Sequence, residues 1–178
     1  MLVEDETDIL LFPPLRAAWA ERGQQAKVWL TGRNARRVVF GTLNLCTGHL
    51  VLMTRTRQQA PDFGAFLKDL RRRYRDRPLV VLLDEDPSHT AGASRALAAA
   101  LGIRLIWLPK RCPELNPMEH LWRAAKQNVN ANRQDATIER TVTRFLRYLG
   151  RLTPRSVLRK AGVRSRHFWL RRGLSNRR

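Results

Sequence analysis

Three acidic side chains stand at the ends of predicted structural elements, where carboxylates can gather around a cation. Asp5 ends the first short apolar stretch, and Asp84 follows a wholly apolar run at residues 79–83. Glu119 falls in the first turn of a helix that is predicted to begin at Pro117. Mg²⁺ is held in proteins by one or two carboxylates together with waters and substrate phosphates. The three acids therefore predict a site for a divalent metal ion.

Simpler roles for two of these acids remain open. Asp84 could merely leave its strand or help to start the following helix. Glu119 is the third helical residue after Asn116, an arrangement typical of a capping box. In favour of chemistry, Arg123 and Lys126 share the helix face of Glu119, beside an apolar stripe. An acid and two cations are thus predicted along one exposed line.

The chain is strongly basic. Its 178 residues include 34 Lys and Arg against 15 Asp and Glu, which gives a formal net charge of +19 and a pI of about 11.7. Such a charge attracts polyanions, and nucleic acid is the commonest polyanionic partner. The length suits one domain with a substantial core.

Membrane insertion and disulfide bonding are both disfavoured. No stretch reaches the roughly 18 uninterrupted apolar residues of a spanning helix, and residues 1–6 are acidic where a signal peptide would be basic. Cys46 and Cys112 have neither a disulfide pattern nor metal-binding spacing. A reducing cytoplasm is therefore the expected compartment.

The apolar patterning predicts an α/β fold with a mixed sheet flanked by helices. A turn at 46–48 joins strands 37–45 and 49–54 as an antiparallel hairpin. Strand 79–84, helix 91–101 and strand 103–108 predict a right-handed parallel crossover. The other predicted elements are a first strand at 2–6, a connector with a short helical turn at 11–23, helices at 61–74, 117–130 and 135–150, and a shorter helix within 153–178.

Three motifs agree in order and spacing with those of a known family. They are Asp5-Glu6-Thr7, then Asp84-Glu85-Asp86-Pro87-Ser88-His89, then Leu115-Asn116-Pro117-Met118-Glu119-His120-Leu121-Trp122 followed by Lys126. With these motifs the chain resembles the DDE transposases of the mariner-like superfamily, in the bacterial insertion-sequence branch. The catalytic domain of that family has an RNase H-like (retroviral-integrase-like) fold. The third motif is the most specific of the three.

The resemblance implies a metal-dependent DNA transposase with Asp5, Asp84 and Glu119 as catalytic residues and metal ligands. Two Mg²⁺ or Mn²⁺ ions would serve cleavage at the transposon ends and transfer of the freed 3′-hydroxyl to target DNA. The family also implies a homo-oligomeric complex on DNA, in the bacterial cytoplasm at the nucleoid. Two rival interpretations are a catalytically inactive DNA-binding remnant and another RNase H-like nuclease.

A single domain is expected over residues 1–178. Its core would span about 1–130, and a C-terminal helical extension would span about 131–170. The family's N-terminal helix-turn-helix region, which recognises transposon ends, is expected to be absent from this chain and to be supplied, if at all, by a separate upstream polypeptide.

Neighbouring acids complicate the assignment of the first two ligands. Glu4, Glu6 and Asp8 surround Asp5, but Glu4 and Glu6 project to the opposite face of a regular strand. Asp5 is therefore preferred. After the second acid the chain has Glu85, where the family often has Asn, and then a further aspartate, so extra carboxylates could assist or compete for metal.

The candidates for DNA contact are Arg33, Arg36, Arg37, His89, Arg123 and Lys126. The first three precede the hairpin, and further arginines follow its end, so a basic rim is predicted there. Solvated surface is the alternative for all of the cations. His89 is predicted to orient a phosphate or a water, and its alternative is a structural loop or helix-cap role.

Overall fold

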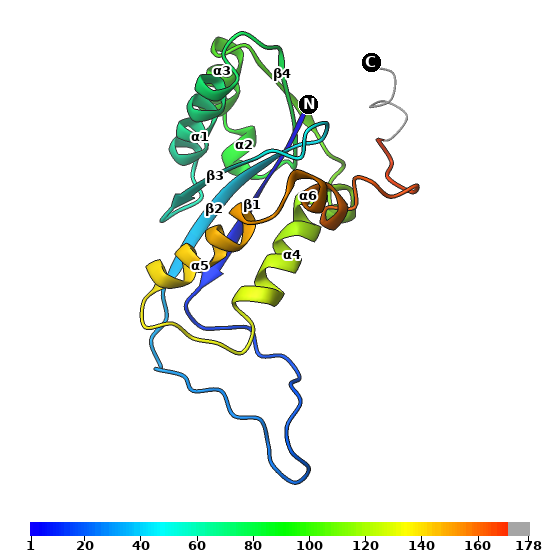
Figure 1. Cartoon of the computed structure of the whole chain (residues 1–178). Helices are drawn as coiled ribbons and strands as arrows, with labels where there is room; N and C mark the ends of the chain where they lie inside the picture. Colours follow the sequence, from blue (N-terminus) through cyan, green and yellow to red (C-terminus); the bar gives the residue numbers. More distant parts are fainter. Residues whose placement is uncertain (171–178) are drawn as a thin grey trace.

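A five-stranded mixed sheet forms the centre of the molecule, whose computed structural model describes residues 1–170 (Figure 1). The strands are β1 (Leu2–Leu10), β2 (Arg36–Asn44), β3 (Leu50–Arg55), β4 (Leu79–Leu83) and β5 (Ile103–Trp107), in the order β3-β2-β1-β4-β5. β1 pairs with β2 and β2 with β3 in antiparallel fashion, whereas β1-β4 and β4-β5 are parallel. The predicted mixed sheet, with its antiparallel hairpin and parallel crossover, is confirmed.

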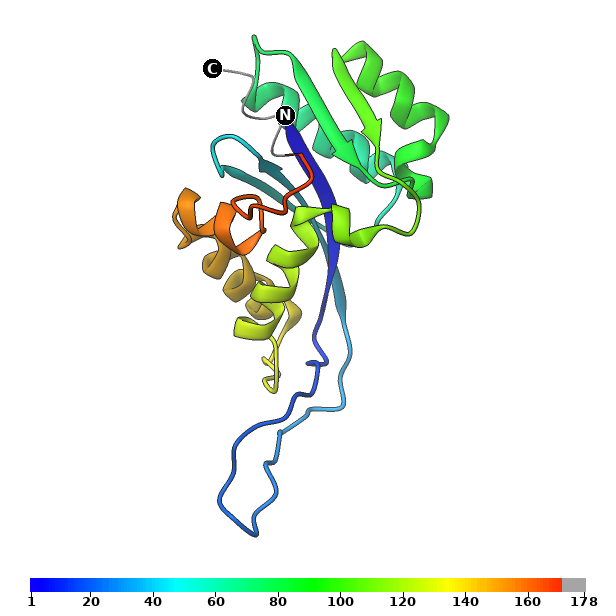
Figure 2. The ribbon, with the colours of Figure 1, turned by 90° about the vertical axis from the view of Figure 1, so that its right-hand side faces the viewer.

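Helices cover both faces of this sheet, and Figure 2 shows the two groups on either side of the strands. The first group is α1 (Ala60–Arg73), α2 (Pro87–Thr90) and α3 (Gly92–Ala100). The second is α4 (Pro117–Val129), α5 (Ile138–Gly150) and α6 (Pro154–Lys160), preceded by a 3₁₀ turn at Pro113–Leu115. Each group encloses its own apolar core, with Phe63 and Phe66 in the first and Trp122 and Phe145 in the second.

The side chains of β1 alternate between the two cores, as the period of a strand requires. Val3 and Ile9 pack in the core below α4, and Leu2 packs in the core below α1. Asp5 therefore faces the α4 side of the sheet. Glu4 and Glu6 face the opposite side, as the sequence predicted.

The C-terminal helices belong to the same packed unit as the strands. Phe145 of α5 and Val157 of α6 are buried in one core cluster with Val3 of β1 and Met118 of α4. Within residues 1–170, the segment after residue 130 therefore completes the cover of one sheet face. Residues 171–178, which the predicted domain includes, lie outside the described residues.

Two predictions about the N-terminal third are wrong. β1 does not end at Glu6 but continues to Leu10, because residues 7–10 pair with the start of β2. The stretch 11–23 contains no helix and opens a long loop that Figures 1 and 2 show extending away from the sheet. Its Pro13-Pro14 pair removes two backbone donors, and its exposed Trp19 has no apolar partner face.

The short helix α2 was also not predicted. It is built locally, since the Asp86 side chain accepts hydrogen bonds from the backbone N–H of Ser88 (2.8 Å) and from its hydroxyl (2.6 Å), with Pro87 at the first helical position. This turn sets the direction of His89, which matters for the site described below.

Within the described residues 1–170, no helix is both long enough and apolar enough to cross a lipid bilayer.

Candidate metal-binding active site

The three predicted acids come from distant parts of the chain and line one cavity of about 380 Å³. Asp5 lies in the middle of β1, and Asp84 is the first residue after β4. The parallel register pairs Val3 with Leu82, so Asp5 and Asp84 each lie two residues beyond the same pair. Glu119, from the first turn of α4, closes the group. The fold therefore brings together the residues that the sequence singled out.

The position of Glu119 depends on its neighbour Asn116, which joins helix α4 to strand β1. The Asn116 side-chain oxygen accepts a hydrogen bond from the Met118 N–H (3.0 Å), and its amide nitrogen donates to the backbone carbonyl of Glu4 (3.0 Å). Asn116 is only 4% exposed, so both bonds are sheltered from water. The start of α4 is thus tied directly to the residue before Asp5.

The capping-box alternative for Glu119 is weakened by this arrangement. A capping box would need the Asn116 N–H as the donor to the Glu119 carboxylate. That N–H instead donates to the backbone carbonyl of Pro113 (2.9 Å). Asn116 caps the helix by itself, and Glu119 lines the cavity.

The electrostatics of the cavity favour a cation. Burial, and then the nearby charges of Glu119, Glu6 and Asp84, raise the pKa of Asp5 well above its usual range. Asp5 Oδ2 is buried and has no hydrogen-bond partner among the described residues 1–170. A divalent cation would satisfy this oxygen and relieve the repulsion among the acids. Asp5, Asp84 and Glu119 supply the hard oxygen donors that Mg²⁺ and Mn²⁺ accept, so the residues fit such ions.

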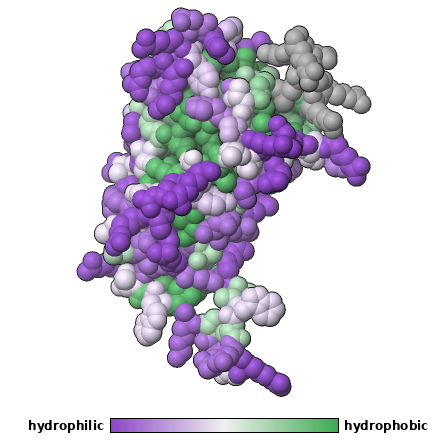
Figure 3. All heavy atoms as spheres, viewed as in Figure 1, coloured by the Kyte–Doolittle hydropathy of each residue, from purple (hydrophilic) through white to green (hydrophobic). Residues whose placement is uncertain are grey.

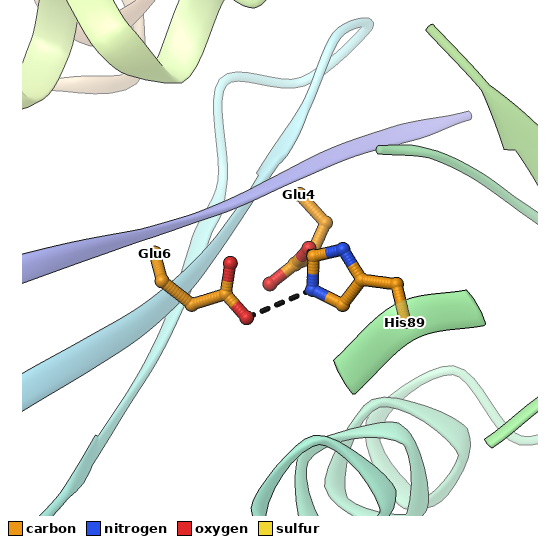
Figure 4. A group of neighbouring side chains, drawn as sticks. All are labelled: Glu4, Glu6 and His89. Carbon is orange, nitrogen blue, oxygen red and sulfur yellow. Dashed lines mark hydrogen bonds and ion pairs between the residues drawn. The ribbon is translucent and has the colours of Figure 1, made fainter. Parts of the chain in front are cut away.

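A second, tighter group lies on the other face of β1 (Figure 4). Glu4, Glu6 and His89 each offer one ligand atom within 4.8 Å of the other two, a criterion that Asp5, Asp84 and Glu119 do not meet together. The His89 Nε2 atom lies 2.8 Å from Glu6 Oε1 and 3.4 Å from Glu4 Oε2. Because this group is almost fully buried, whereas the cavity on the other face is open to a substrate, we place the candidate active site at the cavity.

His89 connects the two groups. Its Nδ1 atom lies 2.9 Å from Asp84 Oδ1, while Nε2 faces the glutamates. Burial would lower the pKa of His89, but the hydrogen bonds to Asp84 and Glu6 and the charges of the glutamates raise it to about 11. The hydrogen bond with His89 lowers the pKa of Asp84 against the opposing effect of burial. The imidazolium therefore keeps Asp84 ionised.

The remaining acids near the site already have partners. Glu85 forms an ion pair with Lys110 (3.1 Å), and Asp86 caps α2. Asp8 forms an ion pair with Arg36 (2.8 Å). Together with the burial of Glu4 and Glu6 beside His89, these contacts favour Asp5 as the first-strand ligand.

The structure places the predicted DNA-contacting residues in different environments. His89 is 1% exposed and both ring nitrogens are engaged, so a direct DNA contact at His89 is not supported. Arg123 and Lys126 line a cavity of about 240 Å³ with Glu119, beside the candidate site. Burial lowers the pKa of Lys126, and the charges of Asp8, Glu119 and Asp5 oppose that effect.

The predicted basic rim forms only in part. Arg36 and Arg57 line one cavity of about 640 Å³ that also includes Asp86, so this portion lies near the site. Arg37 instead pairs with Glu139 of α5. Hydrophilic residues dominate the face shown in Figure 3, with apolar atoms visible in a band down its middle.

Glu4, Glu6 and Asn116 are contributors to the site that the sequence did not identify in that role. Asn116 was interpreted only as a helix cap, although an asparagine amide can also donate to a second element. The alternation of Glu4 and Glu6 with Asp5 indicated which face of the strand they occupy. The sequence did not indicate that His89 covers that face.

Comparisons with known proteins agree with the fold. The family model described as DDE superfamily endonuclease matches residues 1–141, and the chain therefore belongs to this family. It is 27% identical over 153 residues to the insertion element IS630 uncharacterized 39 kDa protein of Shigella sonnei, covering 85% of this chain and 45% of that protein.

Two solved structures show the same fold. The Mos1 transposase paired-end complex with left transposon end matches with a TM-score of 0.69 at 18% identity, and the mariner Mos1 paired end complex with Mg matches with a TM-score of 0.70 at 19% identity. Each match covers 90% of this chain and 50% of the other. The predicted RNase H-like fold is thereby confirmed, and the chain spans about half the length of these relatives.

Proposed function

We propose that this chain is the catalytic part of a DNA transposase that cuts phosphodiester bonds at transposon ends and joins the freed 3′-hydroxyl to target DNA. The observation that carries the proposal is the meeting of Asp5, Asp84 and Glu119 at one cavity of a DDE-family fold. Burial, and then the charges of Glu119, Glu6 and Asp84, raise the pKa of Asp5, and a bound cation would stabilise its ionised form. The solved structures similar to this chain include a Mos1 transposase complex with a transposon end and a mariner Mos1 complex with Mg.

The three carboxylates would hold two Mg²⁺ or Mn²⁺ ions, which when bound activate the attacking oxygen and stabilise the leaving oxygen. The chain's own residues then orient the nucleic acid. Arg123 and Lys126 lie beside Glu119 and would contact backbone phosphates. Arg36, with Arg33 in the adjoining loop, would extend this track across the sheet, and the charge of +19 would strengthen binding in a salt-dependent way.

Assembly with other molecules follows from the same proposal. Joining two transposon ends to target DNA calls for more than one catalytic domain, so a homo-oligomer on DNA at the bacterial nucleoid is proposed. The family resemblance implies that a helix-turn-helix region, in the same or a separate polypeptide, selects the end sequence.

Nicking of supercoiled plasmid by the purified chain tests the activity. With Mg²⁺ present we expect nicking that chelation by EDTA stops, and we expect Asp84→Asn and Glu119→Gln each to abolish it while DNA binding is kept. Glu85→Gln is the matched control, because Glu85 is adjacent to Asp84 but pairs with Lys110 at the surface.

Unchanged nicking in both Asp84→Asn and Glu119→Gln would refute the site. DNA binding without nicking by the unaltered chain would instead identify an inactive remnant. Joining of an oligonucleotide bearing a free 3′-hydroxyl to plasmid distinguishes a transposase from a plain nuclease.

A further inference from the structure

The side chain of Asp84 is more exposed than its proposed role would suggest. It is 57% exposed and lies on the loop that follows β4. A carboxylate in such a place ordinarily samples several rotamers, and ordering it on metal binding costs affinity. Something must therefore hold Asp84 in place if it is to act as a preorganised ligand.

Within the described part of the chain, the hydrogen bonds to the Asp84 carboxylate are accepted by one oxygen. Oδ1 accepts from His89 Nδ1 (2.9 Å) and from the backbone N–H of Asp86 (3.1 Å). His89 Nδ1 also lies 3.2 Å from the Asp84 backbone carbonyl, so the ring holds the main chain as well as the side chain. The second carboxylate oxygen, Oδ2, is left for another partner.

His89 is itself fixed in orientation. It is 1% exposed, its ring packs against Phe63 with centroids 4.5 Å apart, and Nε2 lies 2.8 Å from Glu6 Oε1. Figure 4 shows the ring meeting the two glutamates that extend from β1. Glu6 is also nearly buried, with 5% of its side chain exposed. A buried ring with charged partners at both nitrogens cannot turn without losing one of them.

We infer that His89, held from behind by Glu6, is a positioning residue that fixes the Asp84 carboxylate with Oδ1 occupied and Oδ2 turned toward the metal. The connection begins on β1, the strand that carries Asp5, and ends at Asp84, the first residue after β4. Glu6 is the neighbour of Asp5 on β1, and the two point to opposite faces. Because Glu6 and Asp5 share strand β1, the Glu6-His89-Asp84 connection sets the position of Asp84 relative to Asp5.

Both ring nitrogens are engaged at the same time. Nδ1 lies within hydrogen-bond distance of Asp84 Oδ1, and Nε2 lies within hydrogen-bond distance of Glu6 Oε1. Outer-shell partners of metal ligands are typically worth about 10- to 100-fold in metal affinity or activity.

Two amide substitutions separate the contacts of the ring. In His89→Asn the side-chain nitrogen lies near the position of Nδ1 and keeps a donor toward Asp84. In His89→Gln the nitrogen lies near Nε2 and keeps a donor toward Glu6 only. Both variants lose the imidazole ring and its packing against Phe63, so these losses cancel in the comparison.

The measurements are Mn²⁺ binding by electron paramagnetic resonance and the metal dependence of plasmid nicking, on the full chain. We expect His89→Gln to weaken metal binding by about 10- to 100-fold and His89→Asn to remain much closer to the unaltered chain. A purely structural role for His89 predicts equal losses in both variants, tracking their thermal stability, and that result would overturn the inference.

A measurement on the unaltered ring covers the case in which the variants fold poorly. The ring ¹H–¹⁵N spectrum should show the Nδ1–H group of His89, and Asp84→Ala should shift the Nδ1 signal far more than the Nε2 signal. An Nδ1–H signal that ignores Asp84→Ala overturns the inference.

Because the inference rests on the proposed function, the two can fail separately. Mn²⁺ binding that is identical in Asp84→Asn and the unaltered chain removes the proposed metal site, and the positioning role with it. Metal-dependent nicking that is lost in Asp84→Asn, but reduced equally by both His89 variants, removes only the positioning role.

Discussion

Gly41 of β2 is where packing and the candidate active site are most closely coupled, and Gly41→Ala should damage both. A methyl group at Gly41 would lie 2.5 Å from Cη2 and 2.7 Å from Cζ2 of Trp122, and 2.8 Å from Cε of Met118. The Met118 methyl can move, but Trp122 is 2% exposed and packs against Phe145. Overpacking of this kind costs about 1–3 kcal/mol in free energy of unfolding.

That free energy corresponds to a measurable change in thermal stability. For a chain of this size each kcal/mol lowers the melting temperature by about 2–4 °C, so calorimetry should show a loss of about 2–12 °C. Gly150→Ala is the matched control, because Gly150 ends α5 with nothing within 4 Å of an added methyl. We expect Gly150→Ala to leave the melting temperature unchanged or slightly raised.

Gly41→Ala should lower the nicking rate by more than the loss of folded protein explains. Gly41 pairs with Asp5 across the sheet, and Trp122 lies one turn after Glu119 on α4. A methyl that pushes Trp122 away therefore moves Glu119 away from Asp5. Misplacement by about 1 Å can cost on the order of 100-fold in rate, so nicking should fall well below the level set by the folded fraction.

A second substitution tests whether Trp122 is the cause. Trp122→Phe removes the ring atoms that meet the new methyl, so the double variant should be more stable than the two single losses predict, with a coupling free energy of about 0.5–3 kcal/mol. The packing argument would be refuted if Gly41→Ala had the melting temperature of the unaltered chain. It would also be refuted if the losses in free energy of unfolding of the two single variants added in the double variant.

Three further predictions concern the same site. Asp5→Asn should raise the melting temperature of the metal-free protein while abolishing nicking, because the folded state raises the pKa of Asp5 and so loses stability as the pH rises through that pKa. The unaltered chain should accordingly bind Mn²⁺ more weakly as the pH falls and release a proton on binding, and a pH-independent affinity across the weakly acidic range would contradict this. Asn116→Ala removes a helix cap, worth about 1 kcal/mol, and leaves the buried Glu4 carbonyl unpaired, worth about 1–3 kcal/mol. Its urea midpoint should fall and nicking should fall with it; normal nicking would show that Glu119 is positioned by other contacts.

Local patterns in the sequence were enough to predict most elements and the three acids. The hairpin followed from a glycine-containing turn between apolar runs, and the parallel crossover from a strand, an alanine-rich helix and a second strand. These patterns involve residues that are close together in the sequence, so they can be recognised before the fold is known. The helical turn expected within 11–23 failed because no apolar face exists for it to pack against.

What the sequence determined by itself was the identity of the candidate ligands and the opposite direction of Glu4 and Glu6 from Asp5, since strand alternation is a local property. Only the tertiary structure decided what covers each face of β1: α4, tied by Asn116 to the Glu4 carbonyl on one side, and His89 of α2 on the other. His89 changed from an expected DNA contact to a buried link between Glu6 and Asp84 for this reason. Burial and hydrogen-bond partners depend on residues far apart in the chain, and no local pattern contains them.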